Sequence, residues 1–177
     1  MINLMRDPGR MGPFILAGLE EMCRNLPLRG VMYEVGSYAG ESAEVFARFF
    51  AEVHCVDPWE GKLYHSEGDG EVEREFDRRT RGLRIVKHKG RSVDVAKGVA
   101  DASLDFVYID ADHSLDAVLA DLSAWLPKVR AGGVIGGHDF LPPDFQWTDV
   151  ARAVERFFHG ALPTVYPDTS WVMEIKG

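Results

Sequence analysis

The stretch EVGSYAGES, residues 34–42, decides the fold. It follows an apolar run at residues 31–35 that is typical of a short strand, and it leads into residues 41–50, whose apolar side chains recur at helical spacing. Gly36 permits a tight turn and the close approach of a ligand, and Gly40 lets the helix begin against the sheet. The backbone N–H groups of this turn form a polar cradle at the carboxyl edge of the sheet, where open α/β sheets bind ligands.

Strand and helix patterns alternate along the chain on both sides of this turn. The expected strands are residues 31–35, 53–56, 83–86, 104–109 and 134–137. The expected helices are residues 13–26, 41–50, 71–81, 93–99, 114–129 and 150–158. Strands that alternate with helices predict a parallel sheet with right-handed crossovers.

The end of the chain changes character. Residues 162–166 and 171–175 are two apolar runs joined by a short turn, which indicates an antiparallel hairpin. We therefore predict one α/β domain, residues 1–177, with a Rossmann-like, doubly wound sheet that is mostly parallel and ends in an antiparallel hairpin. Residues 1–29 would form an N-terminal helix and lid, and residues 30–177 the core.

Composition describes an acidic globular protein. The 177 residues are 46% hydrophobic and 27% charged, with a formal net charge of -8. Phosphate backbones bind to basic faces, so we expect no nucleic-acid partner. The basic run at residues 78–81 follows several acidic residues, and we interpret residues 71–81 as a solvated helix of mixed charge. We see no signal peptide, no apolar run of membrane-spanning length and no CxxC around Cys23 or Cys55, so we expect a reduced, cytoplasmic protein.

Asp57 follows Gly36 at the spacing of a ribose ligand. An acidic residue about 20 residues beyond a glycine turn can accept hydrogen bonds from both ribose hydroxyls of an adenosine. The alternative is that Asp57 and Pro58 only end a strand. The sequence has neither GxGxxG nor GK[ST], which argues against a pyrophosphate ligand. The acidic Glu34 suits a ligand that carries an ammonium and a sulfonium group instead.

Five motifs in this order resemble class I S-adenosylmethionine-dependent methyltransferases. They are EVGSYAGES (34–42), VDPW (56–59), DFVYIDADHS (105–114), WLPKVRAGG (125–133) and GGHDF (136–140). The resemblance is closest to the small-molecule O-methyltransferase subgroup that includes enzymes of macrolide sugar and cephalosporin pathways, and more distant to catechol O-methyltransferase. It covers residues 30–140 and, by topology, the hairpin, and it implies the seven-stranded methyltransferase sheet. Tyr38 departs from the middle glycine that many class I members carry, and the version of the loop with an acidic residue followed by G-x-x-x-G also occurs in this subgroup.

The resemblance also implies an S-adenosylmethionine site. Residues around Gly36 would hold the methionine part, Asp57 the ribose, and the turn after the third strand the adenine, while Asp110 would face the methionine or a metal. The implied cofactor-binding residues are Glu34, Gly36, Ser37, Tyr38, Gly40, Asp57, Pro58, Trp59, Arg91, Ser92 and Asp110.

Polar side chains follow the fourth and fifth expected strands. Asp110, Asp112 and His113 come after residues 104–109, and His138 and Asp139 come after residues 134–137. The ends of neighbouring parallel strands meet at one edge of the sheet, so we expect these side chains to converge. Carboxylates suit Mg²⁺ or Mn²⁺, whereas a histidine favours Mn²⁺, Fe²⁺ or Zn²⁺.

The resemblance assigns roles to this cluster. Asp110 and Asp139 match positions that are ligands in the relatives that use a metal. His138 stands where those relatives have a carboxylate ligand. The resemblance thus implies Asp110, His138 and Asp139 as metal ligands. A hydrogen-bonded network without metal is the alternative. His113 takes the position of a catalytic lysine in catechol-type relatives, and we assign it as the base. The catalytic set is therefore His113, Asp110 and Asp139. The alternative for His113 is a helix N-terminal contact beside the expected cap, Ser114.

Three segments, residues 1–13, 59–70 and 140–147, are expected to cover an acceptor pocket. The aromatic and proline content of the last one suits a planar or sugar-bearing small molecule. The expected function is methyl transfer from S-adenosylmethionine to a hydroxyl of such a molecule, assisted by a divalent ion and a histidine base. The alternatives are a nicotinamide-dependent oxidoreductase, a non-catalytic S-adenosylmethionine-binding module and a metal-dependent hydrolase. A homo-oligomer is left open.

Overall fold

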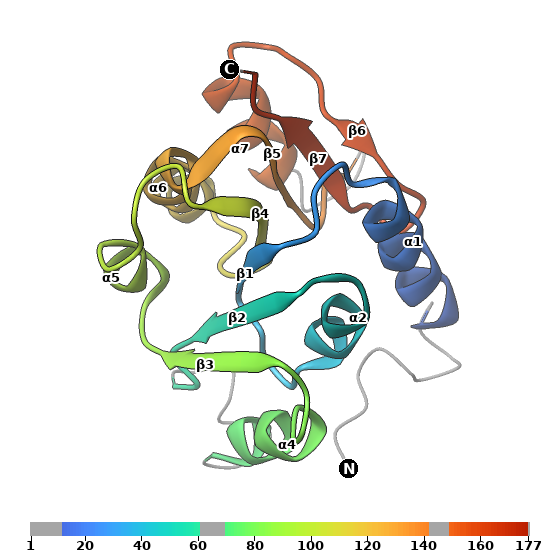
Figure 1. The fold of residues 1–177 in the computed structure, drawn as a ribbon. Helices are drawn as coiled ribbons and strands as arrows, with labels where there is room; N and C mark the ends of the chain where they lie inside the picture. Colours follow the sequence, from blue (N-terminus) through green and yellow to red (C-terminus); the bar gives the residue numbers. More distant parts are fainter. Residues whose placement is uncertain (1–11, 61–69, 142–148, 177) are drawn as a thin grey trace.

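The computed structural model describes residues 12–60, 70–141 and 149–176. Within these residues, seven strands form one sheet in the order β3-β2-β1-β4-β5-β7-β6 (Figure 1). Strands β1 to β5 pair in parallel, β7 pairs antiparallel with β5, and β6 pairs antiparallel with β7. The predicted fold, a mostly parallel sheet with a C-terminal antiparallel pair, is confirmed.

The elements follow the predicted alternation. The strands are β1 (Val31–Val35), β2 (Glu52–Asp57), β3 (Ile85–Lys89), β4 (Leu104–Ile109), β5 (Val129–Gly137), β6 (Thr164–Val165) and β7 (Trp171–Glu174). The helices are α1 (Gly12–Asn25), α2 (Glu41–Phe49), α4 (Glu71–Arg79), α5 (Ser92–Ala96), α6 (Leu115–Trp125), the 3-10 helix η1 (Leu126–Lys128) and α7 (Asp149–Phe157).

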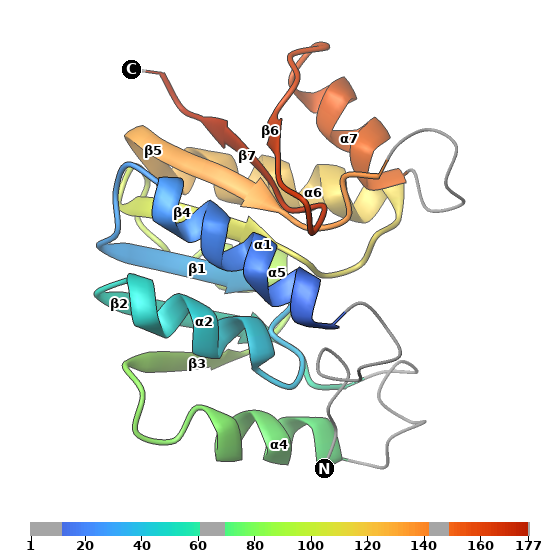
Figure 2. The same cartoon turned by 90° about the vertical axis from the view of Figure 1, so that its right-hand side faces the viewer.

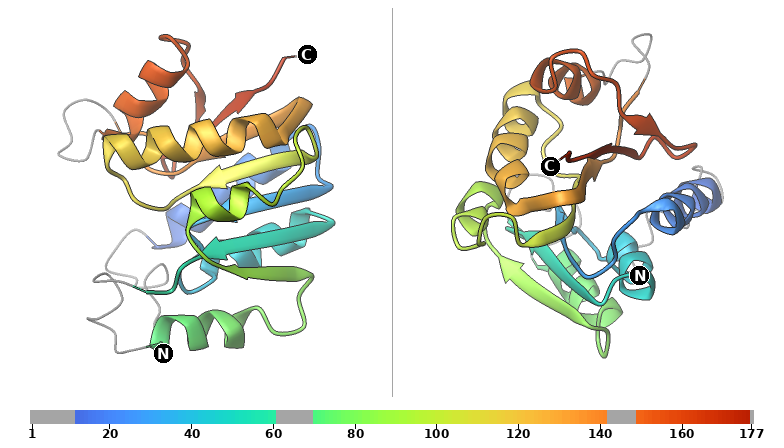
Figure 3. Two further views of the ribbon diagram at one scale, coloured as in Figure 1. Left: turned by 90° about the vertical axis from the view of Figure 1, so that its left-hand side faces the viewer. Right: turned by 45° about the horizontal axis from the view of Figure 1, so that its top comes forward.

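Helices cover both faces of the sheet. α1, α2 and α4 lie on one face (Figure 2), and α5, α6 and α7 lie on the other (Figure 3). Side chains of the central strand β4 alternate between the two cores: Phe106 and Tyr108 pack with α1 and α2, while Val107 and Ile109 pack with α6 and α7. This alternation explains the continuous apolar run of β4, because both faces of a central parallel strand are buried.

The predicted bounds fail where the local pattern is weak. β3 begins at Ile85 rather than at Leu83, and it includes two lysines and a histidine. It is an edge strand, and Val86 within it and Leu83 just before it are each 41% exposed, so the apolar pattern is interrupted. The helix predicted to reach residue 129 ends at Trp125, because Pro127 has no N–H to continue it; η1 follows, and β5 starts at Val129.

The prediction that residues 71–81 form a solvated helix is wrong for one face of α4. Val72, Glu75 and Phe76 are buried, and the side chain of Arg79 is only 5% exposed. A pattern of alternating charge describes an exposed helix only when no neighbour supplies counter-charges, and α4 lies against α2. The basic run therefore belongs partly to the interior.

The expected lid segments, residues 1–13, 59–70 and 140–147, fall largely outside the described residues. Among the helices that the structure does describe, none is long and apolar enough to cross a membrane.

Candidate active site

Gly36 brings the turn after β1 against the end of β4. Its N–H donates to the carbonyl of Val56 at 2.8 Å, and its φ of 90° lies in the left-handed region. A Cβ at this position would lie 2.0 Å from the carbonyl oxygen of Asp110. The N–H of Asp110 donates to the carbonyl of Val35 at 2.8 Å, so the two strand ends are locked side by side. Only glycine fits this turn, as the sequence predicted.

Gly40 forms the start of α2 with a φ of 81°. Its N–H donates to the carbonyl of Ser37 at 2.8 Å, which closes the turn between residues 36 and 40. We call this segment, residues 36–40, the glycine loop. The side chain of Ser37 is buried, and Tyr38 also has a positive φ, of 42°. The glycine loop is therefore set by backbone geometry.

Asp57 ties the glycine loop to the end of β2. One carboxylate oxygen accepts the N–H of Tyr38 at 3.0 Å, and the other accepts the N–H of Trp59 at 2.7 Å. The indole N–H of Trp59 donates to the carbonyl of Tyr38 at 2.8 Å, and Pro58 lies between the two anchors. Asp57 is 1% exposed. A carboxylate oxygen can accept more than one hydrogen bond, so these contacts are compatible with a ribose ligand. The contact of Asp57 with a ribose stays a prediction.

Glu34 lies beneath the glycine loop. Its carboxylate is fully buried and accepts hydrogen bonds from the hydroxyl of Ser42 and, at 3.4 Å, from the thiol of Cys55. Burial raises the pKa of Glu34 to about 7, against the hydrogen bond from Ser42, which lowers it. The carboxylate thus faces α2 and β2, and its predicted contact with the cofactor stays untested.

The turn after β3 lies beside Asp57, because the N–H of Gly90 donates to the carbonyl of Asp57 at 3.1 Å. Arg91 is exposed at the start of α5. The hydroxyl of Ser92 donates to Asp121 at 2.5 Å and accepts the indole N–H of Trp125 at 2.8 Å. The side chain of Ser92 therefore joins α5 to α6. The contact of this turn, Arg91 and Ser92, with adenine stays a prediction.

The predicted reaction centre assembles at the ends of β4 and β5. Nε2 of His113 lies 3.3 Å from Oδ1 of Asp110 and 3.1 Å from Oδ2 of Asp139. The three side chains are partly exposed, at 43% for His113, 21% for Asp110 and 31% for Asp139. Asp139 has a φ of 59°, in the left-handed region that aspartate adopts more readily than most non-glycine residues.

The charges of this centre are strongly coupled. The hydrogen bond to Asp110, and then the one to Asp139, raise the pKa of His113 to about 10, although burial opposes them. Burial lowers the pKa of His138, but the hydrogen bond to Asp139 and the charge of Asp110 outweigh it, and the pKa is about 9. Burial alone would raise the pKa of Asp139, but its hydrogen bonds to His113 and His138 hold it well below its usual range. The two carboxylates therefore favour the positively charged form of both imidazoles in this arrangement.

Two of the predicted metal ligands, Asp110 and Asp139, lie close together, and the full set of Asp110, His138 and Asp139 stays a prediction. Among the described residues, the donor atoms that gather within 4.8 Å of one another belong to Asp110, His113 and Asp139. His138 is not part of that group: its Nδ1 lies 3.1 Å from Oδ1 of Asp139, and its Nε2 is buried with no hydrogen bond to the described residues. Nε2 of His113 thus contacts the carboxylates of both Asp110 and Asp139, whereas Nδ1 of His138 contacts that of Asp139.

Asp112 and Ser114 do not join the centre. Ser114 is the N-cap residue of α6, but its hydroxyl makes no capping hydrogen bond. Instead, the carboxylate of Asp112 accepts the N–H of Ser114 at 2.9 Å. His113 makes its contacts with the carboxylates, which disfavours the alternative that it is only a contact at the helix start.

A buried network that no sequence pattern indicates contributes to the electrostatics of His138. The hydroxyl of Tyr108 lies 2.8 Å from that of Ser170, which donates to Asp168 at 2.8 Å. The charge of Asp168 contributes to the raised pKa of His138. Asp168 and Ser170 lie in the turn before β7, and no local sequence pattern connects them with the ends of β4 and β5.

Comparison with known proteins gives a family match and several structural likenesses. Residues 33–140 match the model of a family described as a methyltransferase domain. The chain is similar to the O-methyltransferase TomG from Streptomyces achromogenes, involved in tomaymycin synthesis and solved with S-adenosylmethionine, at 20% identity over 94% of this chain and 81% of that chain, with a TM-score of 0.65. No curated protein matches the chain.

Two further solved structures share the fold. CalS11, a TDP-rhamnose 3'-O-methyltransferase of calicheamicin biosynthesis, is 15% identical over 93% of this chain and 80% of that chain, with a TM-score of 0.66. An O-methyltransferase from Bacillus cereus in complex with S-adenosylhomocysteine is 20% identical over 91% of this chain and 80% of that chain, with a TM-score of 0.60. At these identities the likeness establishes the fold.

Proposed function

The chain belongs to the methyltransferase domain family and is an S-adenosylmethionine-dependent methyltransferase, and we propose that it methylates a hydroxyl of a small molecule. The observation that carries this proposal is the position of His113 between two carboxylates beside the glycine loop. The names of the structural neighbours TomG and CalS11, which are O-methyltransferases, support the choice of an oxygen acceptor.

The glycine loop supports S-adenosylmethionine over a dinucleotide. In dinucleotide enzymes the pyrophosphate sits at the N-terminus of the helix that follows the loop. Here the first turn of α2 carries Glu41 and Glu44, and the buried Glu34 lies beneath the loop. Glu41 and Glu44 share the cation of Arg79 with Glu75, so this helix start keeps an excess of negative charge, which disfavours a pyrophosphate and is compatible with a cofactor that bears positive charge.

The reaction needs one proton acceptor. The acceptor oxygen attacks the methyl carbon of the sulfonium, the new O–C bond forms as the S–C bond breaks, and S-adenosylhomocysteine leaves with the sulfur lone pair. The hydroxyl proton must go to a base within hydrogen-bond reach. We assign this role to Nε2 of His113. Asp110 and Asp139 orient the imidazole, and their charge must be compensated before Nε2 can lose its own proton and accept another.

The donor set fits a divalent cation. Two carboxylates and an imidazole gather at an exposed edge, a chemistry that suits Mg²⁺ or Mn²⁺. When bound, such an ion would compensate the two carboxylates and lower the pKa of a coordinated hydroxyl. Nε2 of His113 cannot both coordinate an ion and accept a proton. We therefore assign Asp110 and Asp139 as the ligands and His113 as the base.

Formation of S-adenosylhomocysteine tests this function. The full chain is incubated with S-adenosylmethionine and a panel of catechols, phenols and sugar hydroxyls, with Mn²⁺ or Mg²⁺ added or with a chelator. We expect acceptor-dependent product that chelation and Asp139→Asn both reduce. Asp112→Asn is the matched control, because Asp112 lies in the same segment and contacts the start of α6. Full turnover after exhaustive chelation would reject the metal, and equal loss in both variants would reject the assignment of Asp139.

A further inference from the structure

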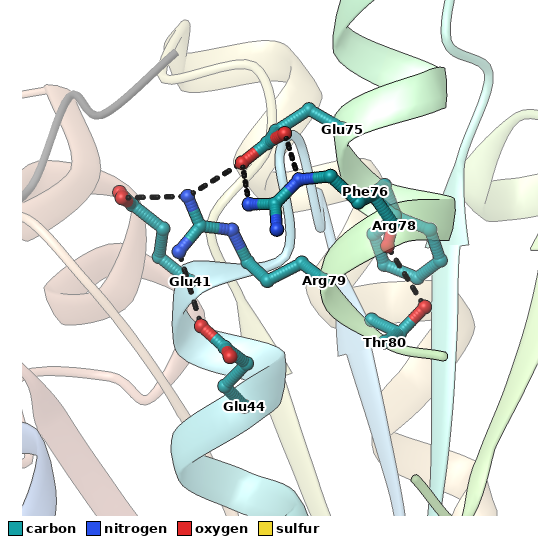
Figure 4. Close-up of polar contacts among 7 residues, drawn as sticks. All are labelled: Glu41, Glu44, Glu75, Phe76, Arg78, Arg79 and Thr80. Carbon is teal, nitrogen blue, oxygen red and sulfur yellow. Dashed lines mark hydrogen bonds and ion pairs between the residues drawn. The ribbon is translucent and has the colours of Figure 1, made fainter. Parts of the chain in front are cut away.

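The end of α4 lies beside the start of α2. Figure 4 shows the guanidinium of Arg79 extending from the last turn of α4 toward Glu41 and Glu44 of α2. α2 begins directly after the glycine loop, so these two glutamates are the first charged residues beyond it. The charged end of α4 therefore reaches the junction between the glycine loop and α2.

Arg79 joins three carboxylates at this junction. Its Nη2 lies 3.3 Å from Oε1 of Glu41 and 3.0 Å from Oε1 of Glu75, and its Nη1 lies 3.0 Å from Oε2 of Glu44. The side chain of Arg79 is 5% exposed, and those of Glu41 and Glu75 are 6% and 9% exposed. A planar guanidinium can address several carboxylates at fixed angles, which a lysine ammonium cannot do.

Side chains of α4 also pack against Gly40 at the junction between the glycine loop and α2. A Cβ on Gly40 would lie 3.0 Å from Cδ2 of Phe76 and 3.3 Å from Cγ2 of Thr80. Thr80 is held in turn, because its hydroxyl donates to the carbonyl of Phe76 at 2.8 Å. The carbonyl of Gly40 accepts the N–H of Glu44 at 3.1 Å, so Gly40 is fixed from both helices.

We propose that Arg79 is a positioning residue for the glycine loop: by holding Glu41 and Glu44 it fixes the junction between the loop and α2 and thereby strengthens cofactor binding. The inference rests on the proposed function in one respect, namely that the glycine loop binds S-adenosylmethionine. Arg79 itself does not touch the cofactor. Its effect passes through the carboxylates at the start of α2, whose mutual repulsion it cancels in a buried setting.

Calorimetric titration with S-adenosylhomocysteine tests this role in the full chain. Arg79→Gln should weaken binding about tenfold, because charge-assisted hydrogen bonds that order the loop are lost. Arg79→Lys should recover affinity to within about threefold of the wild type, since it keeps the charge without the planar fork. Arg78→Gln is the matched control: Arg78 also binds Glu75, at 2.7 Å, but its side chain is 56% exposed, and a change within about twofold is expected.

The outcomes separate positioning from stability. A purely structural role would lower the melting temperature of Arg79→Gln while the folded protein binds S-adenosylhomocysteine with wild-type affinity, and that result would overturn the proposal. Equal weakening by Arg78→Gln would overturn it too. If Arg79→Gln does not fold, Glu44→Gln decides: about threefold weaker binding supports the proposal, and wild-type affinity contradicts it. Failure of the wild-type chain itself to bind would instead reject the proposed function.

Discussion

The glycine loop and the reaction centre share one edge of the sheet but are built on different principles. The loop is defined by backbone: Gly36 and Gly40 have positive φ, and a buried Asp57 fixes it through main-chain N–H groups. The centre is defined by side chains that are partly exposed and coupled by charge, with His113 between Asp110 and Asp139. The loop is thus complete in the folded chain. In the reaction centre, the negative charge of Asp110 and Asp139 must be compensated before His113 can act as a base.

The largest expected effect comes from breaking the loop with Gly36→Ala. The new Cβ would meet the carbonyl oxygen of Asp110 at 2.0 Å, which forces the ends of β1 and β4 apart. We expect a loss of about 4 kcal/mol or more in the free energy of unfolding, together with loss of S-adenosylhomocysteine binding. Urea unfolding and calorimetry measure the two effects.

Gly82→Ala is the control for Gly36→Ala. Gly82 has a φ of 82°, and a Cβ there would meet nothing within 4 Å. It should lose only the strain of a left-handed residue, about 1–2 kcal/mol. Equal destabilisation by the two substitutions would mean that the close approach to β4 does not govern the loop.

His113→Ala is expected to reduce turnover while cofactor binding stays unchanged. Loss of a general base should reduce turnover by about 10²–10⁴-fold, measured as S-adenosylhomocysteine formed with an accepted hydroxyl substrate. Affinity for S-adenosylhomocysteine should stay near that of the wild type, because the loop is anchored independently of His113. A variant that keeps full turnover at every pH would remove His113 from the mechanism.

A smaller effect is expected from Glu34, through pH. Its pKa in the folded protein is about 7, above the ordinary value of 4.5, because burial disfavours the charged form. The stability that this group contributes is complete below about pH 4.5 and is lost as the pH rises through about 7. Glu34→Gln removes this pH-dependent loss. The melting temperature of the variant should therefore rise relative to that of the wild type as the pH increases from 5 to 8.

Melting temperatures of wild type and Glu34→Gln across this range give the difference directly. Glu155→Gln, at an exposed position of α7, controls for the loss of one carboxylate from the surface. A difference between Glu34→Gln and the wild type that stays constant with pH would show that the buried carboxylate does not titrate in this window.

How much the sequence predicts depends on how local the signal is. β1 and β4 were predicted with the bounds that the structure has, because buried parallel strands carry continuous apolar runs. β3 was displaced, since an edge strand alternates with lysines and a histidine. The pairing of Gly36 with Asp57 was recognisable from spacing, although the carboxylate proved to bind the backbone of the loop.

Side-chain direction and tertiary charge pairing were beyond the sequence. The resemblance implied His138 as a metal ligand, which stays a prediction, whereas the contact of His113 with both carboxylates depends on side-chain direction. The basic run ending α4 was interpreted as solvated, whereas Arg79 is buried because α2 supplies Glu41 and Glu44 from a distant part of the chain. Such pairings follow from how helices pack, which no local pattern records.

The most direct test of the central claim is a calorimetric titration of the full wild-type chain with S-adenosylhomocysteine and, in parallel, with NAD. A glycine loop flanked by Glu34, Glu41 and Glu44 predicts stoichiometric binding of S-adenosylhomocysteine and none of NAD. Tight binding of NAD with no binding of S-adenosylhomocysteine would contradict the account.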